Sequence, residues 1–268
     1  LLKESVRLAA KTVFAAADVP YRVRPGPRIL IYHQIGAGPG RQMAVTEEAF
    51  EGQVRWLTEN GTIVSLQEAL DRAGEPGSEE LFVLTFDDGY RDMYEKAFPL
   101  LASEKIPFTV YVTTRPVETG EPLFPGGRAD PVSWSELEAM QSELMTVGAH
   151  THTHPDLRAV DSDTVERELD ESDRLIEERL SVRPEHFCYP YGYWSSSADG
   201  AVRSRYRSAT LGAGGDLLAD TDPYLVPRIP IQLSDGMFFF KRKMRSGMRL
   251  EEVVRRRVAG YVGVTQDA

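Results

Sequence analysis

The sequence predicts an α/β fold in which a mostly parallel β-sheet is wrapped by helices and is either open or closed into a barrel. Short apolar runs rich in β-branched and aromatic residues alternate with amphipathic helical segments. The chain shows no internal repeat and no low-complexity stretch. Its polar, chemistry-bearing residues fall where the predicted strands end, which is where α/β folds carry their active sites.

The composition is typical of a globular protein with a proper core. The chain has 268 residues, of which 41% are hydrophobic and 27% are charged. Its net charge of −10 argues against general nucleic-acid binding. No apolar run is long enough to span a bilayer and no signal peptide is visible, although the start at Leu1 leaves an upstream segment open. The single cysteine, Cys188, excludes an internal disulfide and a cysteine-based zinc cluster.

Helices and strands are expected to alternate from one end of the chain to the other. The expected strands are 28–35, 62–64, 81–86, 108–112, 147–149, 186–189, 206–211 and 225–233. The expected helices are 1–23, 46–60, 65 onward, 91–104, 133–144, 163–180 and 249–262, with N-caps at Thr46, Ser65 and Ser133. Residues 115–131 are expected to form a long Gly- and Pro-rich loop that serves as a functional rim.

Two adjacent carboxylates, Asp87 and Asp88, follow the apolar run 81–86 and precede Gly89. Neighbouring side chains within a strand point to opposite faces, but past its end Gly89 can adopt an unusual backbone angle. Both carboxylates can then turn toward one pocket, where one would hold a metal and the other would move protons. The alternative is an ordinary surface turn, for which Asp-Asp-Gly is also suited.

A histidine cluster, His150, His152 and His154, follows the predicted strand 147–149. His150 and His154 could bind one ion if the turn between them folds back, and His152 would then point elsewhere. Imidazoles together with a carboxylate suit zinc, and three protein ligands with an open position are typical of catalytic zinc. A solvated turn, or histidines bonded to local carbonyls, is the alternative.

Three stretches together resemble the motifs of the polysaccharide deacetylase family, the NodB homology domain of carbohydrate esterase family four. They are Thr-Phe-Asp-Asp-Gly at 85–89, His-Thr-His-Thr-His at 150–154 and Tyr-Pro-Tyr-Gly at 189–192. The resemblance extends over about residues 28–231. It implies a distorted (β/α) barrel of about seven strands, with residues 1–27 as an N-terminal helix and linker and 28–268 as the catalytic domain with a C-terminal helix.

The resemblance also implies an activity and its residues. The enzyme would be a metal-dependent hydrolase that removes N-acetyl groups, or alternatively O-acetyl groups, from a glycan and releases acetate. Asp88, His150 and His154 would bind the metal, Zn²⁺ first, with Co²⁺, Ni²⁺ or Mn²⁺ as alternatives, and Asp87 would be the catalytic base. Such an ion can acidify a water and polarise an amide carbonyl. The backbone N–H of Tyr191 is the expected oxyanion donor.

Two departures from the commonest family pattern affect the roles. No histidine follows His186, so the late histidine that would protonate the leaving amine is missing. His33 is the expected substitute, as in the permuted branch that contains poly-N-acetylglucosamine deacetylases, and a buried core histidine is the alternative. Cys188 stands where the third motif usually has arginine, and Arg228 is expected to orient Asp87 instead, although a strand-end arginine is often simply solvated or paired.

The remaining expectations concern partners. Pro190, Tyr193 and Trp194 flank the predicted site and are expected to bind substrate. Residues 237–245 combine aromatic and basic side chains, so they form either a core element with a solvated basic flank or a contact with an anionic membrane or lipid-linked glycan. A cell-envelope or extracytoplasmic location is favoured, and the cytoplasm stays open. The rival functions are hydrolysis of a non-sugar cyclic amide and silent glycan binding.

Overall fold

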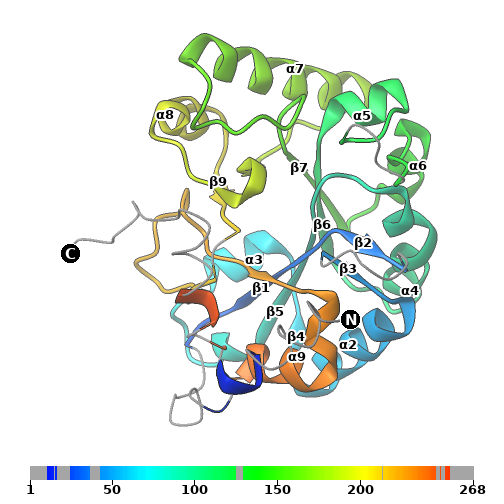
Figure 1. Ribbon diagram of the computed structural model, residues 1–268, viewed down its shortest axis with the longest axis vertical. Helices are drawn as coiled ribbons and strands as arrows, with labels where there is room; N and C mark the ends of the chain where they lie inside the picture. The colour runs from blue at the N-terminus through cyan, green and yellow to red at the C-terminus, as the bar shows by residue number, and fades with distance from the viewer. Residues whose placement is uncertain are drawn as a thin grey trace.

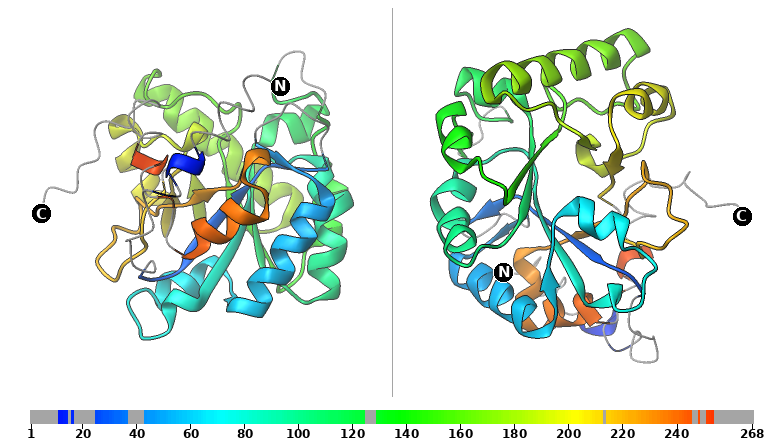
Figure 2. Two further views of the ribbon diagram at one scale, coloured as in Figure 1. Left: turned by 60° about the horizontal axis from the view of Figure 1, so that its bottom comes forward. Right: turned by 180° about the vertical axis from the view of Figure 1, so that it is seen from behind.

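A curled parallel sheet surrounded by helices forms the body of the protein (Figures 1 and 2). The computed structural model describes residues 11–14, 16, 25–36, 43–124, 129–212, 214–245, 248 and 251–253. Within these residues the sheet order is β10, β1, β5, β6, β7, β8 and β9, and β4 pairs with the start of β5. All of these pairings are parallel. The predicted distorted (β/α) barrel of about seven strands is confirmed.

The strands are short and buried. They are β1 (Arg28–Tyr32), β4 (Thr62–Ile63), β5 (Leu81–Phe86), β6 (Phe108–Val112), β7 (Met145–Ala149), β8 (His186–Cys188), β9 (Ser208–Thr210) and β10 (Ile229–Pro230), and a separate parallel pair is β2 (Gln34–Ile35) with β3 (Ala44–Val45). Every residue of β1, β5 and β6 is buried. Burial on both faces explains why these strands read as continuous apolar runs.

Most of the helices lie on the outer side of the sheet, whereas the short helix Leu66–Asp71 lies inside its curve (Figures 1 and 2). The helices are α2 (Glu47–Asn60), α3 (Leu66–Asp71), α4 (Phe98–Ser103), α5 (Thr114–Thr119), α6 (Trp134–Met140), α7 (Ser162–Leu180), α8 (Ser196–Arg205) and α9 (Gly236–Arg245). The predicted caps are confirmed, because Thr46, Ser65 and Ser133 each accept a hydrogen bond from the backbone N–H three residues on. None of the described helices could span a membrane.

Alternate residues of the central strands pack into two different apolar clusters. Phe82, Leu84 and Phe86 belong to the large cluster, which also includes apolar side chains of α2, α6 and α7. Leu81 and Val83 belong to a smaller one, with Tyr111, Cys188 and Val226 among its members. Side chains of β5 on the same face as Leu81 and Val83 therefore point toward the cluster that contains Cys188 and Val226.

One extended segment joins the two edges of the sheet. Val226 pairs with Thr210 at the end of β9, and three residues later β10 begins to pair with β1. The backbone N–H of Leu211 donates to the carbonyl of Val226 at 2.9 Å, which continues the ladder. Arg228 lies between the two pairings and is only 1% exposed. The connection therefore carries a buried arginine toward the ends of the central strands.

Several predicted boundaries are wrong. The expected strand 28–35 breaks at His33, between β1 and β2. The expected helix 91–104 begins with a π-helical turn at Met93–Ala97. The expected strand 225–233 is reduced to β10, because its first part pairs with β9 and its last part enters a 3₁₀ turn.

Residues 115–131, expected to be a loop, begin inside helix α5. Pro116 is the third residue of this helix, where its missing N–H leaves no hydrogen bond unmade. Gly120 ends the helix with a φ of 73°. The expected helices 1–23 and 249–262 lie mostly outside the described residues.

Residues 237–245 form helix α9, so the expected core element is a helix with a basic end. Phe239 and Phe240 are buried, whereas Phe238 is 65% exposed. Lys243 is also buried and donates to the carbonyl of Pro230 at 3.0 Å. Most of the aromatic surface of α9 thus packs against the protein, and membrane contact stays a prediction.

His186 in β8 gives the fold a pH dependence. Its Nδ1 lies 2.8 Å from Ser208 Oγ, and burial lowers the pKa of its imidazole from 6.5 to about 4. Between these values the unfolded chain binds the proton and the folded chain does not. The free energy of unfolding should therefore fall by about 3 kcal/mol from this group as the pH drops from 6.5 to 4. Denaturant unfolding of His186→Gln over this range should show a shallower decline, and a slope identical to that of the parent would contradict the assignment.

Candidate active site

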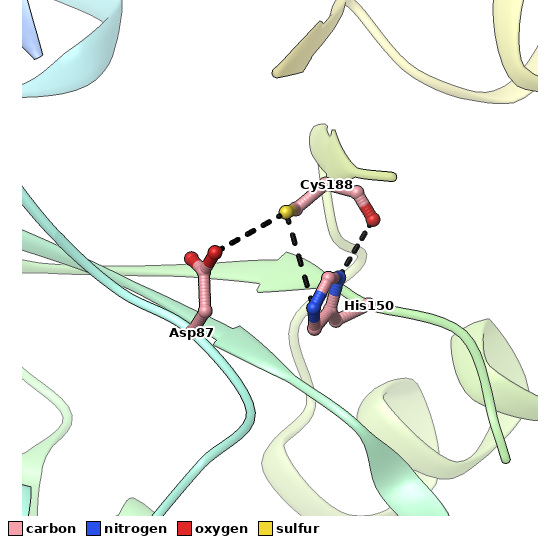
Figure 3. A group of neighbouring side chains, drawn as sticks. All are labelled: Asp87, His150 and Cys188. Carbon is pink, nitrogen blue, oxygen red and sulfur yellow. Dashed lines mark hydrogen bonds between the residues drawn. The ribbon is translucent and has the colours of Figure 1, made fainter. Parts of the chain in front are cut away.

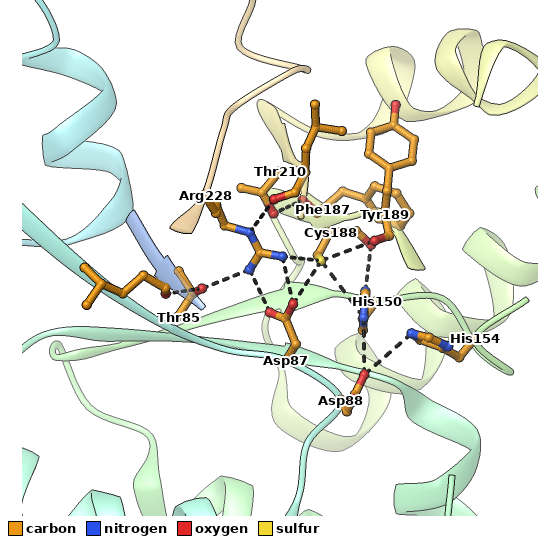
Figure 4. A network of polar contacts seen from close by, with 12 residues as sticks. Thr85, Asp87, Asp88, His150, His154, Phe187, Cys188, Tyr189, Thr210 and Arg228 are labelled. Carbon is orange, nitrogen blue, oxygen red and sulfur yellow. Dashed lines mark hydrogen bonds and ion pairs between the residues drawn. The ribbon is translucent and has the colours of Figure 1, made fainter. Parts of the chain in front are cut away.

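The two adjacent carboxylates lie at the carboxyl end of β5, as predicted. Asp87 continues the direction of Thr85, toward the segment that carries Arg228 (Figure 4). Asp88 then adopts a φ of 74° and Gly89 a φ of 76°, so the chain turns and both carboxylates line the same cavity. The sequence placed the unusual angle at Gly89 alone. A left-handed aspartate is uncommon, and here it is what brings the second carboxylate back.

Asp88 converges with two histidines from the end of β7. Its Oδ1 lies 3.4 Å from His150 Nε2 and 3.5 Å from His154 Nε2. One ligand atom from each residue lies within 4.8 Å of the others. This carboxylate oxygen is buried, and no hydrogen-bond partner satisfies it within the described residues. One carboxylate and two imidazoles around an unsatisfied oxygen fit a divalent cation with open coordination positions.

The outer side of His150 is fixed by the backbone of β8. Its Nδ1 lies 2.7 Å from the carbonyl oxygen of Cys188, which can only accept, so Nδ1 carries a proton and Nε2 faces Asp88. Burial opposes a charged His150, but the Cys188 sulfur and the Asp88 and Asp87 carboxylates raise its pKa well above the usual value. Burial lowers the pKa of His154 to about 4. A bound cation would replace the proton on His150 Nε2.

A buried glutamate on α7 holds the turn that carries both histidines. Glu168 Oε2 accepts the backbone N–H groups of His152 and Thr153 at 2.9 and 2.7 Å, and Oε1 accepts the Thr153 hydroxyl at 2.5 Å. The His154 N–H donates to Thr151 Oγ1 at 3.1 Å. The side chain of His152 turns away, with its Nδ1 2.9 Å from Thr114 Oγ1. This confirms that the turn folds back and that His152 points elsewhere.

Glu168→Ala is expected to weaken divalent-metal affinity about 10- to 100-fold, because three hydrogen bonds to the ligand-bearing turn are lost. Isothermal titration with Zn²⁺ or Co²⁺ would measure the effect. Glu177→Ala, an exposed glutamate of the same helix, is the matched control and should bind as the parent does. Equal affinities for the two variants would show that the turn is held without Glu168.

Arg228 and Asp87 form a buried bidentate ion pair (Figure 4). Arg228 Nη1 and Nη2 donate to Asp87 Oδ1 and Oδ2, both at 2.7 Å, and Nη1 also donates to Thr85 Oγ1 at 2.9 Å. Burial alone would raise the pKa of Asp87, but the guanidinium outweighs it and lowers that pKa below 3.8. The structure thus makes the contact that the sequence suggested, and Asp87 is held ionised in a fixed orientation.

The side chain of Cys188 lies beside this ion pair. Its Sγ lies 3.6 Å from Asp87 Oδ2 and 4.0 Å from His150 Nε2 (Figure 3). Asp87, His150 and Cys188 therefore form a second group with metal-ligand spacing. However, Arg228 Nη2 lies 2.9 Å from the same sulfur. A guanidinium already occupies this position, so a second cation is disfavoured there and the Asp88 group is the better metal site.

The candidate residues surround one cavity of about 380 Å³. From the predicted set it is lined by Asp87, Asp88, His33, His150, His154, Tyr191, Tyr193 and Arg228. His33 has a buried Nδ1 without a hydrogen-bond partner in the described part of the chain. Tyr191 has a φ of 58°, and its ring lies 4.6 Å from that of His154. The expected acid and the expected oxyanion donor therefore share the cavity with the candidate metal ligands.

Of the three residues predicted to bind substrate, one lines the cavity and two do not. Tyr193 lines the cavity, with the Arg158 guanidinium 3.7 Å from its ring centroid, so one ring face is covered. Neither Pro190 nor Trp194 is among the described lining residues. Trp194 packs against the core, and its indole N–H donates to Asp199 at 3.0 Å.

The sequence did not indicate several residues that line the cavity, nor the glutamate that holds the histidine turn. Gln34, Met43, Tyr90, Phe124 and Glu252 also line the cavity. The loop signal at 115–131 could have drawn attention to Phe124. Glu168 had no such signal, because it lies in a helix whose sequence is charged almost throughout.

Residues 74–208, half of the chain, match the family model described as polysaccharide deacetylase. The chain therefore belongs to the polysaccharide deacetylase family. It is a hydrolase of this family, and the predicted enzyme class is confirmed. The matched segment contains Asp87, Asp88, His150, His154 and Tyr191, whereas His33 and Arg228 lie outside it.

Individual relatives agree with the family. The chain is 26% identical over 215 residues to the poly-β-1,6-N-acetyl-D-glucosamine N-deacetylase of Staphylococcus aureus, covering 74% of this chain and 70% of that protein. It is 34% identical over 128 residues to the Escherichia coli enzyme of the same name, over 43% of this chain but only 19% of that protein. IcaB from Ammonifex degensii superposes with a TM-score of 0.68 and 26% identity, over 84% of this chain and 97% of that chain.

Proposed function

We propose that this protein removes N-acetyl groups from an amino-sugar glycan, with one divalent cation held by Asp88, His150 and His154. The observation that carries the proposal is the convergence of these three side chains on an unsatisfied buried oxygen, beside a fourth group, Asp87, that is held ionised. The name of the Staphylococcus relative supports an N-acetylated glucosamine polymer as the substrate class.

The reaction consumes one water and one acetamide and yields acetate and an amine. The cation supplies a Lewis acid that polarises the amide carbonyl and acidifies water. Asp87 accepts the proton of the attacking water, and Arg228 keeps Asp87 oriented and deprotonated until then. Tyr191, on the cavity wall, offers its backbone N–H to the developing oxyanion.

Departure of the amine requires a proton donor, because an amide anion is too poor a leaving group. His33 lines the same cavity as Asp87, and its Nδ1 has no partner among the described residues. We assign it the role of general acid, since histidine can donate a proton near neutral pH. Arrangement of the base and the acid in one cavity lets the two proton transfers occur on one bound acetamide.

The test measures acetate release from N-acetylglucosamine oligomers and from an O-acetylated xylan, and ring opening of a cyclic imide. Each assay is run after chelation and again after addition of Zn²⁺, Co²⁺, Ni²⁺ or Mn²⁺. The proposal expects metal-dependent acetate from the N-acetylated oligomers in excess of the other substrates. Hydrolysis confined to the cyclic imide, or glycan binding without acetate under every metal, would favour the rival functions.

A further inference from the structure

Four charged side chains from distant parts of the sequence form a buried ion cluster. Lys11 and Lys243 both pair with Asp235, and the Lys243 Nζ lies 2.9 Å from its Oδ2. Lys11 Nζ also lies 3.5 Å from Glu251 Oε1. None of the four residues is more than 6% exposed. Because breaking a buried ion pair leaves an uncompensated charge, the cluster holds together the segments that carry its members.

This ion cluster lies directly behind one wall of the catalytic cavity. Lys243 Nζ donates to the carbonyl of Pro230 at 3.0 Å, and Asp235 Oδ2 accepts the backbone N–H of Gln232 at 2.7 Å. Pro230 is one of the residues that line the cavity. The cluster therefore supports the cavity wall from the side that faces away from the substrate.

The chain runs from the ion cluster into the cavity. Glu251 belongs to the cluster, whereas its neighbour Glu252 lines the catalytic cavity. Phe14 packs against Phe239 of α9 and Met248, and the Glu252 N–H donates to the Met248 carbonyl at 3.1 Å. Figure 2 shows the first and last described segments close together, in dark blue and red. Residues near both ends of the sequence thus hold one carboxylate at the cavity.

The carboxylate of Glu252 lies against the backbone of Gly214. A Cβ at Gly214 would lie 2.2 Å from the carboxyl carbon of Glu252, so glycine leaves the space that this side chain occupies. Gly212, two residues earlier, donates its N–H to the carbonyl of Gly192 at 3.2 Å, and Gly192 follows the expected oxyanion donor, Tyr191. Glu252 therefore lies on the side of the cavity that carries the third motif.

A carboxylate in this position suits the hydroxyl groups of a sugar. It accepts several hydrogen bonds at once, and bonds to a charged acceptor are stronger than those to a neutral one. Among the described lining residues the other carboxylates are Asp87 and Asp88, which face Arg228 and the two histidines. The proposed reaction gives both of these a role, but it does not use Glu252.

We propose that Glu252 binds hydroxyl groups of the sugar unit that is being deacetylated, and that Lys11 is a positioning residue that holds Glu252 in place through Glu251. The inference rests on the proposed function and adds a substrate-binding residue to it. It also makes residues near both ends of the sequence part of the substrate site. Glu252 takes no part in the proton transfers, so its effect belongs to KM and not to kcat.

The test is steady-state acetate release from N-acetylglucosamine oligomers by the zinc-loaded full chain. Glu252→Gln should raise KM about tenfold and change kcat less than about threefold, as expected when a charged acceptor is lost. Gly214→Ala should raise KM similarly, because its Cβ displaces the Glu252 carboxylate without changing its chemistry, and the backbone angle at Gly214 is one that alanine can adopt. A parent KM in both variants would overturn the role of Glu252.

Lys11→Met tests the positioning role. Asp235 keeps its pair with Lys243 in this variant, so the link to Glu251 is the contact that is lost. KM should rise as it does in Glu252→Gln, and the double variant should show no further rise, since both changes act on the same contact. Additive increases in KM would show that Lys11 acts elsewhere and would overturn its positioning role.

Two further variants complete the experiment. Glu251→Gln breaks the same link from its other side and should reproduce the KM of Lys11→Met; a parent KM in both would also overturn the positioning role. Lys241→Met, an exposed lysine of α9, is the matched control and should behave as the parent does. Absence of acetate from every oligomer with the parent protein would instead overturn the proposed function.

Discussion

His150→Ala is expected to abolish stoichiometric binding of a divalent cation and to lower acetate release by at least about 10³-fold. The substitution removes one of the three proposed ligands and leaves Asp88 and His154, which are too few for a stable site. Loss of the cation would also remove a Lewis acid, which typically stabilises the transition state by several kcal/mol. Metal content after gel filtration and acetate release measure the two effects on one preparation.

His152→Ala is the matched control for this variant. It removes the same residue type from the same turn, but the His152 ring contacts Thr114 and does not face Asp88. Metal content and acetate release should therefore stay near those of the parent. Stoichiometric metal in His150→Ala, or equal loss in both variants, would contradict the ligand assignment.

Asp87→Asn is expected to keep the metal and to lose turnover by about 10²- to 10⁴-fold. The amide cannot accept the proton of the attacking water, and general-base catalysis is typically worth this much. The three proposed ligands are untouched, so stoichiometric zinc should remain. Single-turnover acetate release together with metal analysis would show whether the variant loses catalysis while it keeps its zinc.

Stability must be measured on the same variant, because Arg228 is buried and would face an uncharged amide. An unpaired buried charge typically costs about 3–5 kcal/mol, and thermal unfolding should register this loss. Arg228→Met, which leaves the Asp87 carboxylate unpaired instead, should be destabilised by a similar amount. If Asp87→Asn is folded, metal-loaded and fully active, the base is another residue.

The sequence located most of the catalytic cavity because parallel strands end on one side of a sheet. Asp87, Asp88 and the histidine turn each follow a buried strand, and β5, β6 and β7 are neighbours. Periodicity indicates where a strand ends, and the topology then brings the ends together. The pairing of Arg228 with Asp87 was suggested by the arginine missing from the third motif. Periodicity could not establish it, since the pairing depends on the way the segment after β9 crosses to β1.

Features that depend on local backbone conformation and on tertiary packing could not be predicted from the sequence. The left-handed angle of Asp88 is uncommon for any residue other than glycine, and only the cavity it serves explains it. Glu168 looks like any other acidic residue of α7 until the histidine turn is placed against it. Phe124 follows a short helix that propensity did not indicate, and only the folded chain shows that it lines the candidate site.

Anomalous diffraction at the zinc edge from crystals of the metal-loaded protein would show whether Asp88, His150 and His154 hold the cation. One strong peak is expected at about 2.0–2.2 Å from His150 Nε2, His154 Nε2 and an Asp88 oxygen. Asp87 should remain paired with Arg228 and outside the coordination sphere. A peak bound instead by Asp87 and the Cys188 sulfur, or no peak between Asp88 and the two histidines, would contradict it.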